Sequence, residues 1–187
     1  MIKHITLPIG PEELRQLHAG DVVAISGTLY TARDAAHKRM AEALDRGEDL
    51  PFDVKGQGVY YLGPAPAKPG QVIGSAGPTS SYRMDRYTPM LLERGLKVMI
   101  GKGRRSQAVV DAMVRYGAVY FAATGGAAAL LAKSIVDCRV VAYDDLGTEA
   151  IRKLMLNDLM ATVAIDCYGV DQYNRGPELY LAHKNYI

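Results

Sequence analysis

The sequence contains no tryptophan, only two phenylalanines and only two cysteines among its 187 residues. The cysteines, Cys138 and Cys167, lie far apart in the chain and form neither a CxxC pair nor a group with the spacing of metal ligands. Each is therefore typical of a small buried hydrophobic residue. This scarcity excludes an iron–sulfur cluster held by the cysteines of this chain alone.

Long hydrophobic runs and a strong charge of one sign are also missing. No apolar segment has the length of a transmembrane helix, and residues 1–10 lack the apolar core of a signal peptide, so we expect a cytoplasmic protein. The formal net charge of +2 is too small to indicate binding to nucleic acid or to a membrane surface. A hydrophobic content of 49% is typical of a folded globular protein, and the length predicts a single domain spanning residues 1–187.

Patterns typical of strands alternate with patterns typical of helices along the chain. The predicted strands are Ile2–Leu7, Val22–Ser26, Val59–Leu62, Gln71–Ile73, Leu96–Ile100, Ala118–Ala122, Val136–Ala142, Ala161–Asp166 and Leu179–Ala182. The predicted helices are Pro11–Leu17, Thr31–Arg46, Tyr87–Arg94, a segment from Ser106 to Tyr116, Ala127–Ala132 and Thr148–Met155. This alternation predicts an α/β fold with a largely parallel or mixed sheet.

The most informative stretch runs from Gly74 to Gly103. It presents the hydroxyls of Thr79 and Ser80 at a predicted helix start, followed by the guanidinium of Arg83, and it ends with Lys102 between two glycines. A helix N-terminus favours anions, and arginine can bind a carboxylate through two parallel hydrogen bonds. The stretch therefore predicts an anion site, although the same spacing fits a capped helix beside two solvated cations equally well.

Two segments carry a family resemblance. Gly27–Lys38 reads GTLYTARDAAHK, and residues 77–85 read GPTSSYRMD. Together they closely resemble the β subunit of class I fumarases, a module that also occurs in the β subunit of L-tartrate dehydratase and as the C-terminal domain of single-chain class I fumarases. The resemblance extends over nearly the whole chain. It implies a swivelling β/β/α-type domain, in which a mixed, largely parallel sheet is flanked by helices.

The resemblance also implies roles for five residues. Arg33, Arg83 and Lys102 match residues that bind the substrate carboxylates, and Ser80 matches a substrate-binding position that is commonly threonine in the family. Thr79 matches the proposed catalytic base. A threonine hydroxyl is a poor base alone, and in the family an Asp and a His from the other domain or subunit are thought to activate it. No such partner is adjacent in this chain, which fits a site shared between chains.

Three nearby polar residues have structural interpretations. His37 could act as a general acid or base, because histidine titrates near neutrality, but a lone histidine on a helix face is more often a packing or hydrogen-bonding residue. Asp34 is interpreted as a helix-dipole and ion-pair residue. Asp85 is interpreted as structural.

The resemblance implies the β subunit of a heteromeric class I hydro-lyase, and first of all a fumarate hydratase, which adds water reversibly to fumarate and gives L-malate. The partner would be an α subunit in an α2β2-type hetero-oligomer. That subunit would carry the [4Fe–4S] cluster, because this chain has too few thiolates and supplies no metal ligand.

Alternatives remain open at this stage. An L-tartrate dehydratase β subunit, or a hydratase of a methylated fumarate, would use the same carboxylate ligands. A non-catalytic dicarboxylate-binding or assembly module belongs to another class, and the joint presence of Arg33, Thr79, Arg83 and Lys102 argues against it. A self-sufficient, metal-independent hydratase would need a complete acid–base set, and the four histidines form no evident pair in the sequence.

Overall fold

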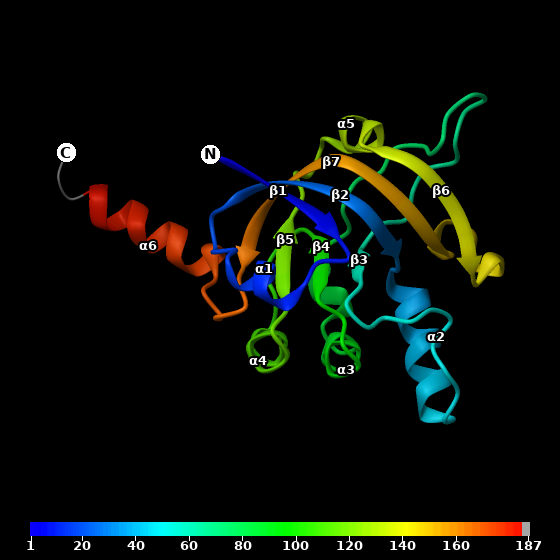
Figure 1. The fold of residues 1–187 in the computed structure, drawn as a ribbon, viewed down its shortest axis with the longest axis horizontal. Helices are drawn as coiled ribbons and strands as arrows, with labels where there is room; N and C mark the ends of the chain where they lie inside the picture. The colour runs from blue at the N-terminus through cyan, green and yellow to red at the C-terminus, as the bar shows by residue number, and fades with distance from the viewer. Residues whose placement is uncertain (185–187) are drawn as a thin grey trace.

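The chain forms a seven-stranded sheet. Figure 1 shows helices beside the strands and the last helix extending away from them. The computed structural model describes residues 1–184, with side chains as far as residue 182. The strands are β1 (Ile2–Leu7), β2 (Val22–Thr31), β3 (Gly58–Tyr60), β4 (Val98–Gly101), β5 (Val119–Ala122), β6 (Ile135–Ala142) and β7 (Ile151–Ile165). The helices are α1 (Pro11–Arg15), α2 (Asp34–Asp45), α3 (Thr88–Glu93), α4 (Gln107–Tyr116), α5 (Ala128–Lys133) and α6 (Gln172–Lys184), with 3-10 helices η1 (Ser81–Met84) and η2 (Asp144–Glu149). The predicted α/β class, with a mixed and largely parallel sheet flanked by helices, is confirmed.

The long strands β2 and β7 each pair with three other strands. One edge of β2 pairs in parallel with β1 and then with β3, while its other edge pairs antiparallel with β7. The far edge of β7 pairs antiparallel with β6 along its first half and with β5 near its end. Because β3, β4 and β5 also pair in parallel, the strands β2, β3, β4, β5 and β7 close into a ring, and β1 and β6 remain as end strands.

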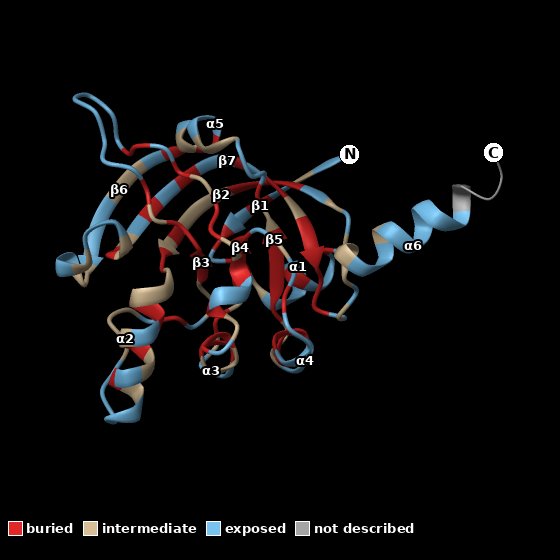
Figure 2. Cartoon of the chain, turned by 180° about the vertical axis from the view of Figure 1, so that it is seen from behind, coloured by how far each residue is buried: buried red, intermediate tan, exposed pale blue. Residues whose placement is uncertain are grey.

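Alternate side chains of β3, β4 and β5 pack into two different cores. Tyr60, Ile100 and Phe121 point into the ring and pack with residues of β1, β2 and β7. Met99 and Tyr120 point to the opposite face and pack with buried residues of α2, α3 and α4. Successive strand residues face opposite sides of a sheet. The strands β3, β4 and β5 therefore form a middle layer, with β1, β2 and β7 on one face and the helices α2, α3 and α4 on the other. Figure 2 shows the buried strands β4 and β5 with α3 and α4 on one side of them.

Most predicted elements are present, but three are wrong. The segment Thr148–Met155 is not a helix, because β7 begins at Ile151 and its pairing with β2 and β6 overrides the helix propensity of its leucine, methionine and lysine residues. Gln71–Ile73 forms no strand and lies in the loop after β3. Leu179–Ala182 lies inside α6, since a short apolar run fits a strand and a helix equally well. Within residues 1–184, no helix has the length and hydrophobicity needed to cross a membrane.

Gly27 lies where the register of β2 against β7 shifts. Its φ is +93°, a conformation that favours glycine, and an added Cβ would lie 2.2 Å from the Leu7 carbonyl oxygen of β1. Glycine is therefore required here both for the backbone conformation and for the close approach of the neighbouring strand.

We expect Gly27→Ala to lower the free energy of unfolding by about 3 kcal/mol, because a left-handed residue costs about 1–2 kcal/mol and overpacking adds about 1–3 kcal/mol. Denaturant unfolding followed by circular dichroism would measure the loss. Gly47→Ala is the matched control, since its φ is +75° but nothing lies within 4 Å of an added Cβ. Equal losses in the two variants would contradict the role given to the close approach.

Candidate functional site

The segments that follow the parallel strands β2, β3, β4 and β5 meet at one edge of the sheet. Arg33 follows β2, Gly63 follows β3 and Lys102 follows β4. The loop 124–126 follows β5. The carboxyl ends of parallel strands are where α/β sheets usually bind ligands, so the topology gathers predicted site residues from distant parts of the chain at this edge.

Residues 79–81 enter between the ends of β3 and β4. The Thr79 N–H donates to the Tyr61 carbonyl over 2.7 Å, and the Ser81 N–H donates to the Lys102 carbonyl over 2.9 Å. Ser80 and Lys102 form a parallel bridge. The structure therefore places the predicted residues Thr79, Ser80 and Lys102 next to one another.

The predicted helix start at this loop has a different form from the one expected. Ser80 precedes η1, but its side chain makes no capping hydrogen bond, and η1 is a 3-10 helix of only 4 residues. So short a helix has almost no macrodipole, which needs aligned peptide units over several turns. The positive charge at this edge therefore comes from its cationic side chains and not from a helix dipole.

Ser81 anchors the loop, and sequence reasoning assigned it no role. Its buried hydroxyl accepts a hydrogen bond from the Lys102 N–H at 3.1 Å and bonds to the Tyr120 hydroxyl at 2.9 Å, which in turn donates to the Gly103 carbonyl at 2.9 Å. An added Cβ on Gly101 would lie 2.0 Å from the Ser81 Oγ. The only sequence signal was a third hydroxyl in the TSS run, whose burial depends on a glycine distant in the chain.

Asp34 brings Arg33 and Arg83 together. Its Oδ2 lies 3.3 Å from Arg83 Nη2 and 3.8 Å from Arg33 Nε, so its predicted role as an ion-pair residue is confirmed. Arg33 Nη2 also lies 3.5 Å from Glu149 Oε1. Arg33 Nε is buried but makes no hydrogen bond to any residue that the structure describes. The two guanidinium groups are thus held near each other by loose ion pairs that leave donors available for an anion.

Lys102 completes the cationic edge. Its side chain is exposed and makes no ion pair with any of residues 1–182. An added Cβ on Gly125 would lie 3.7 Å from Lys102 Cδ and 4.0 Å from Nζ, so the lysine extends along the loop after β5. Its ammonium group is free to bind a negatively charged ligand.

A buried ion pair lies next to the predicted site residues and links the segment after η1 to the segment after β4. Arg105 Nε donates to Asp85 Oδ1 at 2.7 Å, and its Nη2 donates to Thr88 Oγ1 at 2.8 Å. The guanidinium lies 5.2 Å and 5.0 Å from the ring centroids of Tyr61 and Tyr120. Asp85 is therefore structural, as predicted. Sequence reasoning missed Arg105, because it follows another arginine and resembled an ordinary surface cation.

His37 is packed in the core next to Arg33. It is fully buried, its Nδ1–H donates to the Arg33 carbonyl at 2.8 Å, and its ring packs edge-on against Tyr61. The pKa of His37 is lowered from 6.5 to about 4, chiefly because the ring is buried and secondly because Arg105 lies nearby, while the bond to the Arg33 carbonyl opposes this shift. The imidazole is therefore neutral at neutral pH, and it fixes the backbone that carries Arg33.

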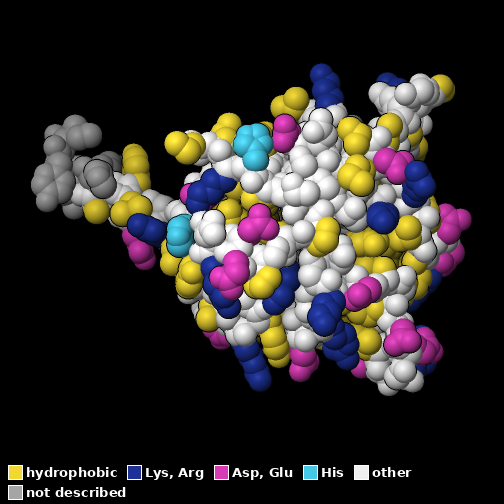
Figure 3. Space-filling view, viewed as in Figure 1, with side chains coloured by type: hydrophobic (Ala, Val, Ile, Leu, Met, Phe, Trp, Pro, Cys, Tyr) yellow, Lys and Arg dark blue, Asp and Glu magenta, His cyan; other side chains and the backbone are white. Residues whose placement is uncertain are grey.

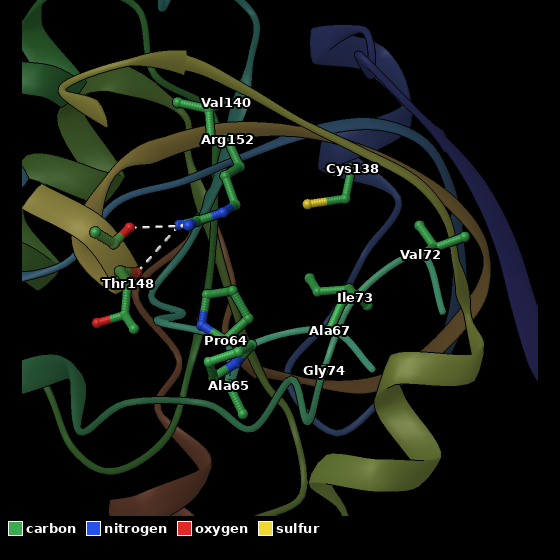
Figure 4. Close-up of a pocket in the computed structure, with 12 residues that line it drawn as sticks. Pro64, Ala65, Ala67, Val72, Ile73, Gly74, Cys138, Val140, Thr148 and Arg152 are labelled. Atoms are coloured by element: carbon green, nitrogen blue, oxygen red, sulfur yellow. Dashed lines mark hydrogen bonds between the residues drawn. The ribbon is translucent and has the colours of Figure 1, made fainter. Parts of the chain in front are cut away.

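The donor atoms of the described chain do not fit an iron–sulfur cluster. Within the part that the structure describes, no three His, Cys, Asp or Glu side chains lie close enough together to hold a metal ion. Cys138 points into a cavity of about 420 Å³ between β6 and the proline-rich segment 64–74, where Arg152 donates to the carbonyls of Gly147 and Thr148 (Figure 4). None of the five predicted site residues lines this cavity. Cys167 is buried elsewhere, with its thiol 3.9 Å from the Leu14 carbonyl.

The sequence matches known proteins over most of its length. The model of the family described as Fumarase C-terminus matches residues 2–176. This chain belongs to the Fumarase C-terminus family. It is 39% identical over 166 residues to "Fumarate hydratase class I, aerobic" of Salmonella typhimurium and to "Fumarate hydratase 2" of Leishmania major. In both cases the match covers 88% of this chain but 29% of the relative, so the chain spans about three tenths of their length.

A relative of similar size is also known for this Fumarase C-terminus chain. It is 37% identical over 169 residues to the "Putative L(+)-tartrate dehydratase subunit beta" of Methanocaldococcus jannaschii. That match covers 87% of this chain and 86% of the relative. The family predicted from the two sequence segments is therefore confirmed.

His37 should make this Fumarase C-terminus chain less stable in acid. A group whose pKa is lower in the folded state stabilises the protein above its unfolded pKa of 6.5, and that stability is lost as the pH falls toward about 4. We expect the wild type to lose up to roughly 3 kcal/mol from this residue, and His37→Gln to lose less over the same interval. Denaturant titrations between pH 7 and pH 4 would measure both slopes, with His18→Gln as the control for an exposed imidazole. Parallel curves for the wild type and His37→Gln would refute this assignment.

Proposed function

We propose that this chain is the β subunit of a heteromeric class I hydro-lyase, and specifically of a fumarate hydratase that interconverts fumarate and L-malate. The observation that carries this proposal is the gathering of Arg33, Arg83 and Lys102 beside the hydroxyls of Thr79 and Ser80 at one sheet edge. The names of the relatives that it matches support the reaction class, and the relative named a subunit beta supports a separate subunit.

The cations suit a small dicarboxylate. Fumarate carries two carboxylates, and the edge offers two guanidinium groups and one ammonium group with few competing partners. Arginine can bind a carboxylate with paired charge-assisted hydrogen bonds, and lysine can bind one as a point charge. Asp34 partly offsets the repulsion between Arg33 and Arg83 in the absence of a ligand. A substrate carboxylate would replace Asp34 as the negative charge between the two guanidinium groups, and it would lie closer to them than Asp34 does.

Thr79 is assigned the proton transfer at carbon. In the dehydration direction it would accept the proton from the carbon next to the hydroxyl-bearing carbon of malate, and in the hydration direction it would return it. Its hydroxyl has no hydrogen-bond partner among the residues that the structure describes, and a threonine hydroxyl needs an activating group. His37 cannot serve, because it is buried under Arg33 and hydrogen-bonded to its carbonyl. We therefore assign the activating Asp and His to the partner subunit.

The partner is also assigned the cofactor. Because the described donor atoms of this chain do not fit a [4Fe–4S] cluster, we assign the cluster to an α subunit, in an α2β2-type assembly in the cytoplasm. This chain's part is to bind and orient the dicarboxylate and to supply the hydroxyl of Thr79.

L-Tartrate dehydration is the second candidate function. The relative of which the match covers 86% is named "Putative L(+)-tartrate dehydratase subunit beta", and L-tartrate has two carboxylates, as malate does. Methylated fumarate would also bind through the same groups. The carboxylate contacts cannot separate these substrates, so a direct comparison of rates is required.

An anaerobic assay of three samples tests the function. This chain alone, the cluster-bearing subunit alone and the two mixed would each be given fumarate and, separately, L-tartrate. We expect activity only in the mixture, with the faster substrate naming the enzyme. Activity in this chain alone would overturn the shared site. Dicarboxylate binding without turnover in any mixture would favour a binding or assembly module.

Arg83→Ala should raise the KM and lower the turnover of the reconstituted enzyme. Loss of one charge-assisted contact to a desolvated carboxylate costs roughly 2–5 kcal/mol, which would appear in kcat/KM. Arg86→Ala is the matched control, because Arg86 lies three residues further on and its guanidinium stacks on Tyr87 rather than joining Asp34. Near-normal kinetics for Arg83→Ala would remove this residue from the site.

Thr79→Ala should mainly lower kcat, because it removes the proton acceptor and leaves the carboxylate ligands in place. Thr79→Ser keeps the hydroxyl and should retain much of the activity. Steady-state kinetics and substrate-dependent exchange of the carbon-bound proton would measure both variants. Unchanged proton exchange in Thr79→Ala would show that another group moves the proton.

A further inference from the structure

β6 ends the sheet, and its outer edge has no strand beside it. Among residues 1–184, β6 pairs with β7 and with no other strand. Val136, Val140 and Val141 are exposed along it. Figure 3 shows hydrophobic side chains next to charges of both signs on the part of the surface where β6 lies in Figure 1. A strand with free backbone N–H and C=O groups along one edge is a template for a further strand.

The sequence of β6, IVDCRVVA, is complementary to itself about Cys138. If two copies of β6 pair antiparallel around a twofold axis at Cys138, Asp137 of each copy faces Arg139 of the other. The two Cys138 residues then face each other. Opposite charges that face each other across antiparallel strands stabilise the pairing.

Charge also selects this register over its neighbours. A twofold axis at Asp137 would place two carboxylates opposite each other, and an axis at Arg139 would place two guanidinium groups opposite each other, both of which are destabilising. The other end strand, β1, reads IKHITL and has no acidic residue to match its own lysine. That lysine, Lys3, is instead paired with Asp21 at 2.6 Å. β6 is therefore the end strand whose own sequence specifies a pairing with itself.

We propose that the outer edge of β6 is a homodimer interface, at which two copies of this chain pair antiparallel about Cys138 and form one continuous sheet. In the single chain, Arg139 Nε lies 2.9 Å from Asp137 Oδ2, and the Arg139 side chain is largely exposed while that of Asp137 is about half exposed. Each copy contributes one such ion pair. Strand pairing would bring the two ion pairs together, so that four charges of alternating sign lie next to one another. The register against β7 shifts near both ends of β6, which confines the regular part of the interface to residues 137–140. This inference does not depend on the proposed enzymatic function.

Charge reversal tests the register. In sedimentation velocity of the full chain over a range of concentrations, we expect a dimer for the wild type and a dissociation constant about tenfold or more higher for Asp137→Arg and for Arg139→Asp, because each places like charges opposite each other. The double variant Asp137→Arg with Arg139→Asp should recover the wild-type dimer. An equimolar mixture of the two single variants should form a heterodimer, which would also show that both are folded.

Cysteine cross-linking tests the position of the axis. Facing residues of antiparallel strands have Cα atoms about 4.5–5.5 Å apart, which is within the range that a disulfide spans. Oxidation with diamide, which takes up the two hydrogens of the two thiols, should give a covalent dimer on non-reducing gels. Because burial raises the pKa of the Cys138 thiol, the reaction should be run at about pH 8.5 or above. Cys138→Ser should abolish the product and Cys167→Ser should keep it.

Three results would overturn the proposal. One is a wild-type chain that stays monomeric at every concentration. Another is a dimer that neither single charge reversal weakens or that forms no disulfide through Cys138. The third is a reversal that weakens only a complex with the cluster-bearing subunit, which would assign this edge to that partner.

Discussion

The antiparallel pairing of β7 with both β2 and β5 is the constraint on which the rest of the structure depends. Thr162 of β7 lies opposite Val22 of β2 and opposite Ala122 of β5, so this one strand closes the ring. Closure aligns the four parallel strands and brings their carboxyl ends to the same edge. Arg33 and Lys102 both lie at this edge because each follows a strand that ends there, and the loop that carries Thr79 fits between two of those ends.

The arginines of this region differ in burial and in how closely they contact a carboxylate. Arg105 is buried, hydrogen-bonded to Asp85 at 2.7 Å and enclosed by aromatic rings, so removing either partner would leave an uncompensated buried charge. Arg33 and Arg83 are partly exposed and reach Asp34 only at 3.8 Å and 3.3 Å. Exposed ion pairs of this kind contribute little to stability. Arg33 and Arg83 are therefore not needed for folding in the way that Arg105 is, and this contrast separates the candidate site from its support.

The sequence allowed local features to be predicted, but not those that depend on distant partners. The helix after TARD and the strand Ile2–Leu7 follow from local periodicity, and both are present. The 15-residue strand β7 was mistaken in part for a helix, because its residues favour helices and only pairing with β2 makes them extended. Ser81 could not be recognised as an anchor, since its burial requires Gly101 to lack a side chain. The site residues themselves came from the family resemblance, because spacing alone could not distinguish ligands from solvated cations.

The turn between β6 and β7 positions Arg33 from a second side. η2 carries Glu149, whose Oε1 lies 3.5 Å from Arg33 Nη2 and whose Oε2 accepts a 2.6 Å hydrogen bond from the Ala35 N–H. In the same turn, Asp145 receives two hydrogen bonds of 2.7 Å from Arg39. The tip of this hairpin is therefore hydrogen-bonded to the first turns of α2, and Arg33 lies between that helix and the end of β2. Since the hairpin is itself fixed by the pairing of β7, the place of Arg33 depends on long-range strand pairing and not only on the TARD segment in which it occurs. A second copy paired along β6 would restrain this same hairpin at its outer strand, at the opposite side from the ring.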